Sequence, residues 1–285
     1  MTTPPTPASA AAAPPAAADT AVLLLRLAAP LQSWGSTSTF NRRETADRPT
    51  KSGVIGLLAA AQGRTRTDPI TDLGALSLGV RVDQAGTVLR DYHTSSDYRG
   101  VPLPSASLTA KGAQKPTSPA KHTHITQRFY LQDAIFLAAV SGPRDLIDTL
   151  RHALTHPAFP LALGRRSCVP TQPLLLEDHT HTTITAALRE TPWLVSKHTR
   201  DQLRKRGTLA PIVTLPTTTD ISPADDSADD GTGTTDVEHD HPVSFAPLTR
   251  SRTTRAVRHG WVDIPTGKAG TADNTDHDPF ALLEW

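Results

Sequence analysis

The sequence predicts an α+β fold, because segments with strand character alternate with two segments of helical periodicity. Residues 21–27, 76–83, 129–140 and 173–176 read as strands. Residues 54–63 (VIGLLAAAQG) and 143–154 carry their apolar side chains at helical spacing. The order along the chain is strand, helix, strand, long excursion, strand, helix, strand. This is the order of the βαββαβ, ferredoxin-like unit.

The two helices have recognisable limits. The first follows Thr50 or Ser52, either of which can serve as N-cap, and it ends at Gly63. The second places leucines and an isoleucine of residues 146–154 on one face, which is typical of a helix packed on a sheet. Between them, residues 76–83 and 88–92 alternate like two strands that can pair across residues 84–86.

The excursion over residues 94–124 is rich in Ser, Pro, Lys and His and has no core pattern. A passive loop of this length is unusual inside a compact domain. We therefore expect a projecting arm or a functional loop.

Composition divides the chain into three parts. Residues 1–19 form an Ala/Pro/Thr tail without apolar periodicity, which we expect to be disordered. Residues 20–183 form the predicted ferredoxin-like unit. Residues 184–285 form a smaller, partly irregular C-terminal region, in which residues 216–242 are an acidic insert that we also expect to be disordered.

Several classes of protein are excluded by composition. The 285 residues include a single cysteine, so neither an internal disulfide nor a Cys-based zinc module can form. The longest apolar run, residues 54–61, is far shorter than a membrane span. The N-terminal residues lack the basic region of a signal peptide. We expect a cytoplasmic protein with no membrane partner.

The formal net charge of +1 hides an uneven distribution. Residues 21–210 contain 24 Lys and Arg against 14 Asp and Glu, a net of +10. Residues 220–241 contain eight acids and no Lys or Arg. A basic body is compatible with a nucleic-acid partner, although ordinary solvated surface explains the same charges. We expect the acidic insert to discourage non-specific nucleic-acid binding.

One basic cluster precedes the first helix. Arg42, Arg43, Arg48 and Lys51 lie close to the predicted helix N-terminus, where free N–H groups and the helix dipole favour phosphate. The spacing does not fit a Walker A loop, so ATP binding is not expected.

A second cluster is the GRRS sequence of residues 164–167. A glycine lets the backbone approach a ligand closely, and two guanidinium groups can grip phosphate oxygens. A solvated turn is the alternative. The arm and its return strand add cations interleaved with aromatic rings, a pattern that suits single-stranded RNA, although a generic polar loop remains the alternative.

The sequence also allows a catalytic interpretation. Tyr92 and His93, with basic residues nearby, could support acid/base cleavage of RNA, although a His in a strand is more often structural. Cys168 follows a basic pair, but a small buried residue is the better interpretation. The i, i+2 histidine pairs lack a third ligand at defined spacing, so no metal and no cofactor is expected.

Several motifs together carry a family resemblance. They are residues 31–35 (LQSWG), 49–53 (PTKSG), 91–94 (DYHT), 97–100 (DYRG), 128–134 (RFYLQDA) and 163–168 (LGRRSC). In this order and spacing, residues 21–178 resemble the CasD family, the fifth-family subunit of the type I-E CRISPR surveillance complex Cascade.

The resemblance implies a ferredoxin-like palm of the RNA-recognition (RAMP) type with a long β-hairpin thumb at about residues 84–128. It implies a non-catalytic subunit that holds the repeat-derived 5′ handle of the CRISPR RNA (crRNA) and contacts the subunits CasC and CasA. Target DNA would be met only through the complex. A sister branch cuts precursor RNA, which leaves a metal-independent endoribonuclease as the alternative. The candidate RNA-binding residues are Arg42, Arg43, Lys51, Ser52, Lys111, Lys115, Lys121, Arg128, Tyr130, Arg165, Arg166 and Ser167.

Overall fold

The computed structural model describes residues 19–35, 41–97, 109–111, 115, 122–176, 181–221 and 233–267. The predicted tail, apart from Asp19, lies outside these residues, as does the middle of the acidic insert. Within the described ranges, no helix has both the length and the apolar character needed to cross a bilayer.

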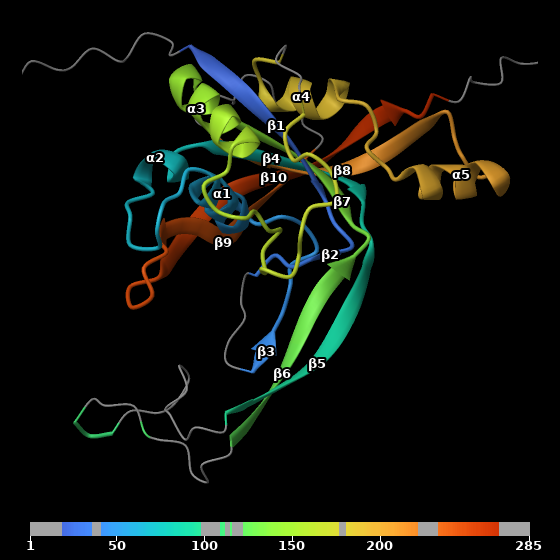
Figure 1. Ribbon diagram of the computed structural model, residues 1–285. Helices are drawn as coiled ribbons and strands as arrows, with labels where there is room; N and C mark the ends of the chain where they lie inside the picture. Colours follow the sequence, from blue (N-terminus) through green and yellow to red (C-terminus); the bar gives the residue numbers. More distant parts are fainter. Residues whose placement is uncertain are drawn as a thin grey trace, which may run out of the picture.

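A six-stranded antiparallel sheet forms the centre of the protein (Figure 1). Every neighbouring pair of its strands is antiparallel. In spatial order the strands are β1 (Thr20–Ala28), β7 (Ile135–Pro143), β4 (Ser77–Gln84), β8 (Ile212–Asp220), β10 (Ser251–Pro265) and β9 (Thr234–Ser244).

Half of this sheet is the predicted ferredoxin-like unit. On the outer side of β1, the backbone N–H of Arg26 donates to Leu174 (2.7 Å) and that of Leu176 donates to Leu24 (3.0 Å). The short segment around Leu175 is thus the fourth strand of the unit, and the spatial order is fourth, first, third, second. The prediction of an α+β, ferredoxin-like fold is confirmed.

Helices α1 (Lys51–Ala61) and α3 (Arg144–Thr155) pack on one face of the sheet, and the one-turn α2 (Thr71–Gly74) follows α1. The Thr50 side chain accepts the N–H of Gly53, which makes Thr50 the N-cap of α1. Alternate side chains of β1 and β7 form one core with the apolar sides of α1 and α3.

The opposite face of the sheet is covered by α4 (Ile184–Glu190), and α5 (Lys197–Lys205) follows beyond a short connection. A fully buried ion pair on β4 holds this connection in place. Arg81 grips Asp83 through two bonds of 2.7 and 2.8 Å, and it also donates to the carbonyls of Leu188, Thr191 and Pro192.

A second, smaller sheet carries the projecting arm. Strands β5 (Thr87–Asp97) and β6 (His122–Gln132) form an antiparallel hairpin that extends away from the main sheet (Figure 1). Short strand β2 (Leu31–Gln32) pairs with β6 at the hairpin base, and β3 (Arg42–Arg43) pairs with the middle of β6. The hairpin thumb of the predicted fold is therefore present in its described part.

The prediction for the C-terminal third needs correction. Strands β8, β10 and β9 continue the main sheet directly beyond β4 instead of forming a smaller irregular region. Residues 216–220 and 234–242 belong to β8 and β9, so most of the described part of the acidic insert is ordered strand.

The physical reason for this order is charge pairing. Arg255 of β10 lies between three carboxylates, those of Asp220, Glu238 and Asp240. Asp220 also accepts from the ammonium group of Lys51 at 2.7 Å. Arg48 also forms an ion pair with Glu238 (2.5 Å). We call these six residues the buried charge network; they are Arg48, Lys51, Asp220, Glu238, Asp240 and Arg255. The acidic segment thus compensates cations of the palm.

Candidate nucleic-acid interface

The base of the hairpin brings the predicted arginine residues together. Residues of β6 alternate between the two faces of the small sheet, so Phe129 lies on one face, and Arg128 and Tyr130 lie on the other. Because β3 pairs with β6 in parallel, Arg42 shares the face of Phe129, and Arg43 shares the face of Arg128. Both faces therefore present a cation beside an aromatic ring.

Arg165 fastens its loop to this base. Its guanidinium group donates to the carbonyl of Phe129 (2.9 Å) and to that of Arg43 (2.7 Å), and it lies 4.5 Å from the centre of the Tyr130 ring. The loop 163–168 is thereby held against β3 and β6. Tyr130 is buried under Arg165, which makes Tyr130 a packing residue of the core.

A glycine is required beside this arginine. Gly164 has φ +94°, and a Cβ atom there would overlap the carbonyl oxygen of Ser33. Ser33 in turn donates its backbone N–H to Leu163 (3.1 Å) and its hydroxyl to the carbonyl of Phe129 (3.3 Å). The close approach of two backbones therefore sets the position of Arg165 and Arg166.

Substituting Gly164→Ala is expected to displace the loop 163–168, because the added methyl group requires both a left-handed backbone and space that the Ser33 carbonyl occupies. We expect destabilisation of about 1–3 kcal/mol in urea unfolding. Gly207→Ala is the matched control, since Gly207 also has a positive φ (+70°) but has nothing within contact distance of an added Cβ. Equal losses in the two variants would contradict a role for the contact with Ser33.

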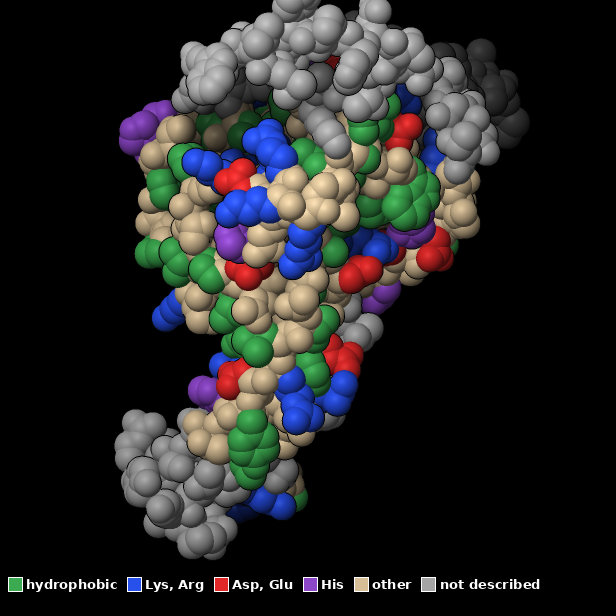
Figure 2. Space-filling model, turned by 90° about the vertical axis from the view of Figure 1, so that its right-hand side faces the viewer, with side chains coloured by type: hydrophobic (Ala, Val, Ile, Leu, Met, Phe, Trp, Pro, Cys, Tyr) green, Lys and Arg blue, Asp and Glu red, His purple; other side chains and the backbone are tan. Residues whose placement is uncertain are grey.

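Three arginines remain accessible around the fastened loop. Arg42, Arg43 and Arg166 are exposed, and Arg42 lies 4.7 Å from the centre of the Phe129 ring while bonding Glu44 at 2.6 Å. Figure 2 shows Lys and Arg side chains beside hydrophobic ones along the hairpin and its base. We define the arginine strip by its members, which are Arg42, Arg43, Arg128, Arg165 and Arg166.

The strip suits a single nucleic-acid strand. Guanidinium groups bind phosphate oxygens through paired donors, and an exposed ring can stack on a base that is not held in a duplex. Ser167 is exposed next to Arg166 and adds a hydroxyl group. Half-buried Arg128 donates to the hydroxyl of Thr126 at 3.3 Å, so it is oriented along the strip.

Two predicted phosphate ligands lie elsewhere. Lys51 is 5% exposed, and its ammonium group forms the ion pair with Asp220; its backbone N–H donates to Asp240 (2.6 Å). Ser52, also 5% exposed, is buried in the first turn of α1. The structure thus speaks against direct phosphate contact by either residue, because the buried charge network covers this helix N-terminus.

The predicted lysines of the arm are not brought to the strip by any described contact. Lys111 and Lys115 are exposed within short described stretches. Lys121 lies outside the described residues. Their contact with RNA stays a prediction.

The structure separates the two residues on which the catalytic alternative relies. Tyr92 and His93 are consecutive on β5, so their side chains point to opposite faces of the hairpin. His93 faces Asp91, with 4.0 Å between the ring Nδ1 and a carboxylate oxygen. One scissile phosphate therefore cannot contact both groups on the same face of the strand.

The described residues contain no candidate metal site, and the cysteine among them is buried. The described ranges contain no cluster of three or more His, Cys, Asp or Glu side chains placed to hold a metal ion. Burial raises the pKa of the Cys168 thiol, so the basic pair before it does not produce a reactive thiolate. Cys168 packs in the main core, in agreement with the structural interpretation.

Sequence reasoning did not single out Arg90 of β5 as a candidate RNA-binding residue. Arg90 lies directly across from Phe129, and 63%-exposed Tyr92 follows on the same face. The alternation of residues 87–94 could have identified Arg90, because every second side chain of β5 lies on the face of the small sheet that also carries Arg42.

Comparison with known proteins gives consistent matches. Residues 22–258 match the model of the family described as CRISPR-associated protein (Cas_Cas5). The chain is 36% identical over 173 residues to the CRISPR system Cascade subunit CasD of Escherichia coli (strain K12), over 54% of this chain and 69% of that protein.

Solved structures agree with this match. A chain of a structure titled "CRISPR RNA-guided surveillance complex" is 34% identical with a TM-score of 0.64, covering 86% of this chain and 91% of that one. A second structure, titled "Crystal structure of Cas protein", is 30% identical with a TM-score of 0.57, covering 87% and 97%.

Proposed function

The chain belongs to the Cas5 family of CRISPR-associated proteins, and from this premise we propose that it is an RNA-binding subunit of a Cascade surveillance complex. Its role is to hold the repeat-derived 5′ handle of the crRNA and to cap one end of the backbone of the complex. Its protein partners are the backbone subunit CasC and the large subunit CasA. Target DNA is reached only through the assembled complex.

The arginine strip is the observation that carries this proposal. Loop 163–168, strand β3 and strand β6 are distant in sequence, and Arg165 ties all three together through two backbone carbonyls. The result is a hairpin surface with Arg42 beside the Phe129 ring on one face, and with Arg43 and Arg128 on the other. Such a surface binds the backbone of one strand and leaves its bases free to stack.

The proposed role is non-catalytic. Handle binding needs phosphate and base contacts, which the strip supplies. Cleavage through the 2′-hydroxyl needs a base at the 2′-oxygen and an acid at the leaving 5′-oxygen of the same phosphate, whereas Tyr92 and His93 point away from each other on opposite faces of β5. The chain therefore retains the handle after another component has produced it.

Replacing Arg43 and Arg166 by Ala together is expected to weaken binding of labelled handle RNA on the order of 10–100-fold, since two charge-assisted phosphate contacts are lost. The slope of log K against log salt is expected to fall by about 1.4, the value for two contacts on a single strand. Thermal unfolding should stay unchanged because both side chains are exposed.

Arg66→Ala removes an exposed arginine from the loop after α1 and serves as the control, for which we expect wild-type binding. Superimposable salt titrations of wild type and double variant would refute the assignment of the strip. The same reactions, run in EDTA on a denaturing gel, test the non-catalytic role. Specific cleavage of repeat RNA that disappears in Tyr92→Phe or His93→Ala would favour the endoribonuclease instead.

A further inference from the structure

A cavity of about 330 Å³ lies on the α5 side of the main sheet, separate from the arginine strip. Arg26 of β1 contributes to it from the sheet, and Lys197 and Arg200 contribute from the first turn of α5. The remaining lining residues are Gln172, Trp193, Leu194 and Val195. The lining thus contains three cations and no acidic side chain.

Two guanidinium groups in this cavity are anchored but incompletely satisfied. Arg26 donates one terminal nitrogen to the carbonyl of Leu194 (3.2 Å), and Arg200 donates one to the carbonyl of Trp193 (2.8 Å). The Nε atoms of both residues are buried, and neither has a hydrogen-bond partner in the described part of the chain. A buried donor left unpaired costs about 1–3 kcal/mol, so neither guanidinium group is fully compensated by the described residues.

The acceptor is not supplied by a neighbouring carboxylate. Asp83, whose charge acts on Arg26, is already bound by Arg81 and by the backbone N–H of Leu194 (2.6 Å). Burial lowers the pKa of Arg26, and the charge of Asp83 offsets this effect only in part. The cavity therefore favours an anion over a neutral molecule.

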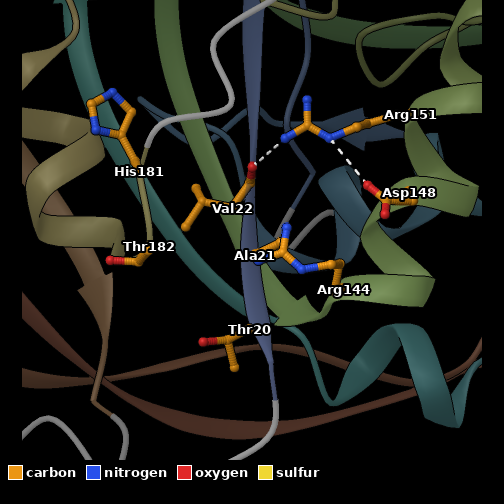
Figure 3. A pocket seen from close by; sticks show the side chains of 8 residues that line it. All are labelled: Thr20, Ala21, Val22, Arg144, Asp148, Arg151, His181 and Thr182. Carbon is orange, nitrogen blue, oxygen red and sulfur yellow. Dashed lines mark hydrogen bonds and ion pairs between the residues drawn. The ribbon is translucent and has the colours of Figure 1, made fainter.

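A second cavity in the described part of the chain shows the contrast. It lies at the start of β1 and is lined by Arg144, Arg151 and His181 (Figure 3). Arg144 forms a two-bond ion pair with Asp19, Arg151 donates to the carbonyl of Val22 (2.6 Å) and faces Asp148, and His181 lies 3.3 Å from Glu190. Both arginines of this cavity thus face a carboxylate of the chain, unlike Arg26 and Arg200.

We propose that the cavity formed by Arg26, Lys197 and Arg200 is a phosphate-binding pocket. A phosphate group offers several acceptor oxygens, which can engage donors converging from β1 and from α5. The N-terminal end of the α5 dipole adds to the attraction. Trp193 is buried, with Arg200 positioned 5.7 Å from its ring centre, so the pocket takes a phosphate and not a nucleobase.

The phosphate can come from an RNA backbone or from a free phosphate compound. Gln172 of the pocket lies four residues after the loop 163–168, which makes an RNA backbone the first source to test. The pocket itself does not rest on the proposed function. Only the RNA arm of the test below does.

The test is a calorimetric titration of the full chain with inorganic phosphate, at an ionic strength held constant with chloride. Lys197→Glu reverses an exposed charge of the pocket and is expected to weaken phosphate binding at least about tenfold. Lys205→Glu is the matched control, because it makes the same change on the same helix but outside the pocket, and we expect no effect. Arg200→Gln provides a second variant with the same expected direction.

The outcomes separate the possibilities. No saturable phosphate binding by the wild type, or equal losses in Lys197→Glu and Lys205→Glu, would overturn the proposal. Acetate binding as tightly as phosphate would also overturn it, because it would indicate a carboxylate of a protein partner. If handle RNA displaces the phosphate, the natural ligand of the pocket is an RNA backbone phosphate. If phosphate stays bound in the presence of RNA, the natural ligand is a free phosphate compound. Either result supports the pocket.

Discussion

The variant Asp83→Asn is expected to lose about 3–5 kcal/mol of unfolding free energy, the range typical of a buried ion pair that loses one partner. Arg81 and Asp83 are both fully buried. The change keeps the shape of the side chain but leaves the guanidinium charge of Arg81 in the interior without a counter-charge. Since whole domains are stable by only about 5–15 kcal/mol, this loss is a large fraction of the total stability.

Urea unfolding followed by circular dichroism measures this loss. Asp72→Asn is the matched control, because Asp72 pairs with Arg64 at the surface, and exposed pairs contribute about 0–1 kcal/mol. If Asp83→Asn and Asp72→Asn cost the same, the burial argument fails.

Local periodicity predicts much of this fold. The order of strands and helices and the cap at Thr50 follow from patterns that extend over a few residues each. The predicted pairing of residues 76–83 with residues 88–92 is wrong, because β4 pairs with β7 and β8 in the main sheet, while β5 pairs with the distant β6. Residues 81–83 show the limit of such patterns. Their alternation predicts a strand with one solvated face, yet that face is covered by α4, because Arg81 binds the carbonyls of Leu188, Thr191 and Pro192. The partners lie more than a hundred residues away.

The candidate site was predictable to a similar degree. Residue type and order pointed to Arg42, Arg43 and Arg166, and all three side chains are exposed. The same reasoning could not distinguish Arg166 from Arg165, whose guanidinium group fastens the loop to β3 and β6. Nor could it show that Lys51 is paired with Asp220, because the partner comes from β8. Ion pairs formed across the sheet therefore decide which basic side chains remain accessible to RNA.

The same ion pairing predicts a second large loss of stability, for the variant Asp220→Asn. One carboxylate oxygen of Asp220 accepts from Lys51, while the other contacts Arg255, and the backbone N–H of Leu78 adds a third bond at 3.0 Å. Asp220→Asn leaves two buried cations short of compensation, so we expect a loss of about 3–5 kcal/mol. The loss should loosen the start of α1, where Lys51 lies, and the β8 end beside β4.

Hydrogen exchange of the full chain locates this effect, and urea unfolding measures its size. Asp236→Asn is the control, because Asp236 belongs to the same acidic segment but its side chain is 66% exposed. If the segment served only to repel stray nucleic acid, the two variants would raise non-specific RNA binding equally and leave stability unchanged. The buried charge network requires the reverse: Asp220 and its partners connect the acidic segment to the palm, so removing one charge there unfolds structure that the exposed acid does not support.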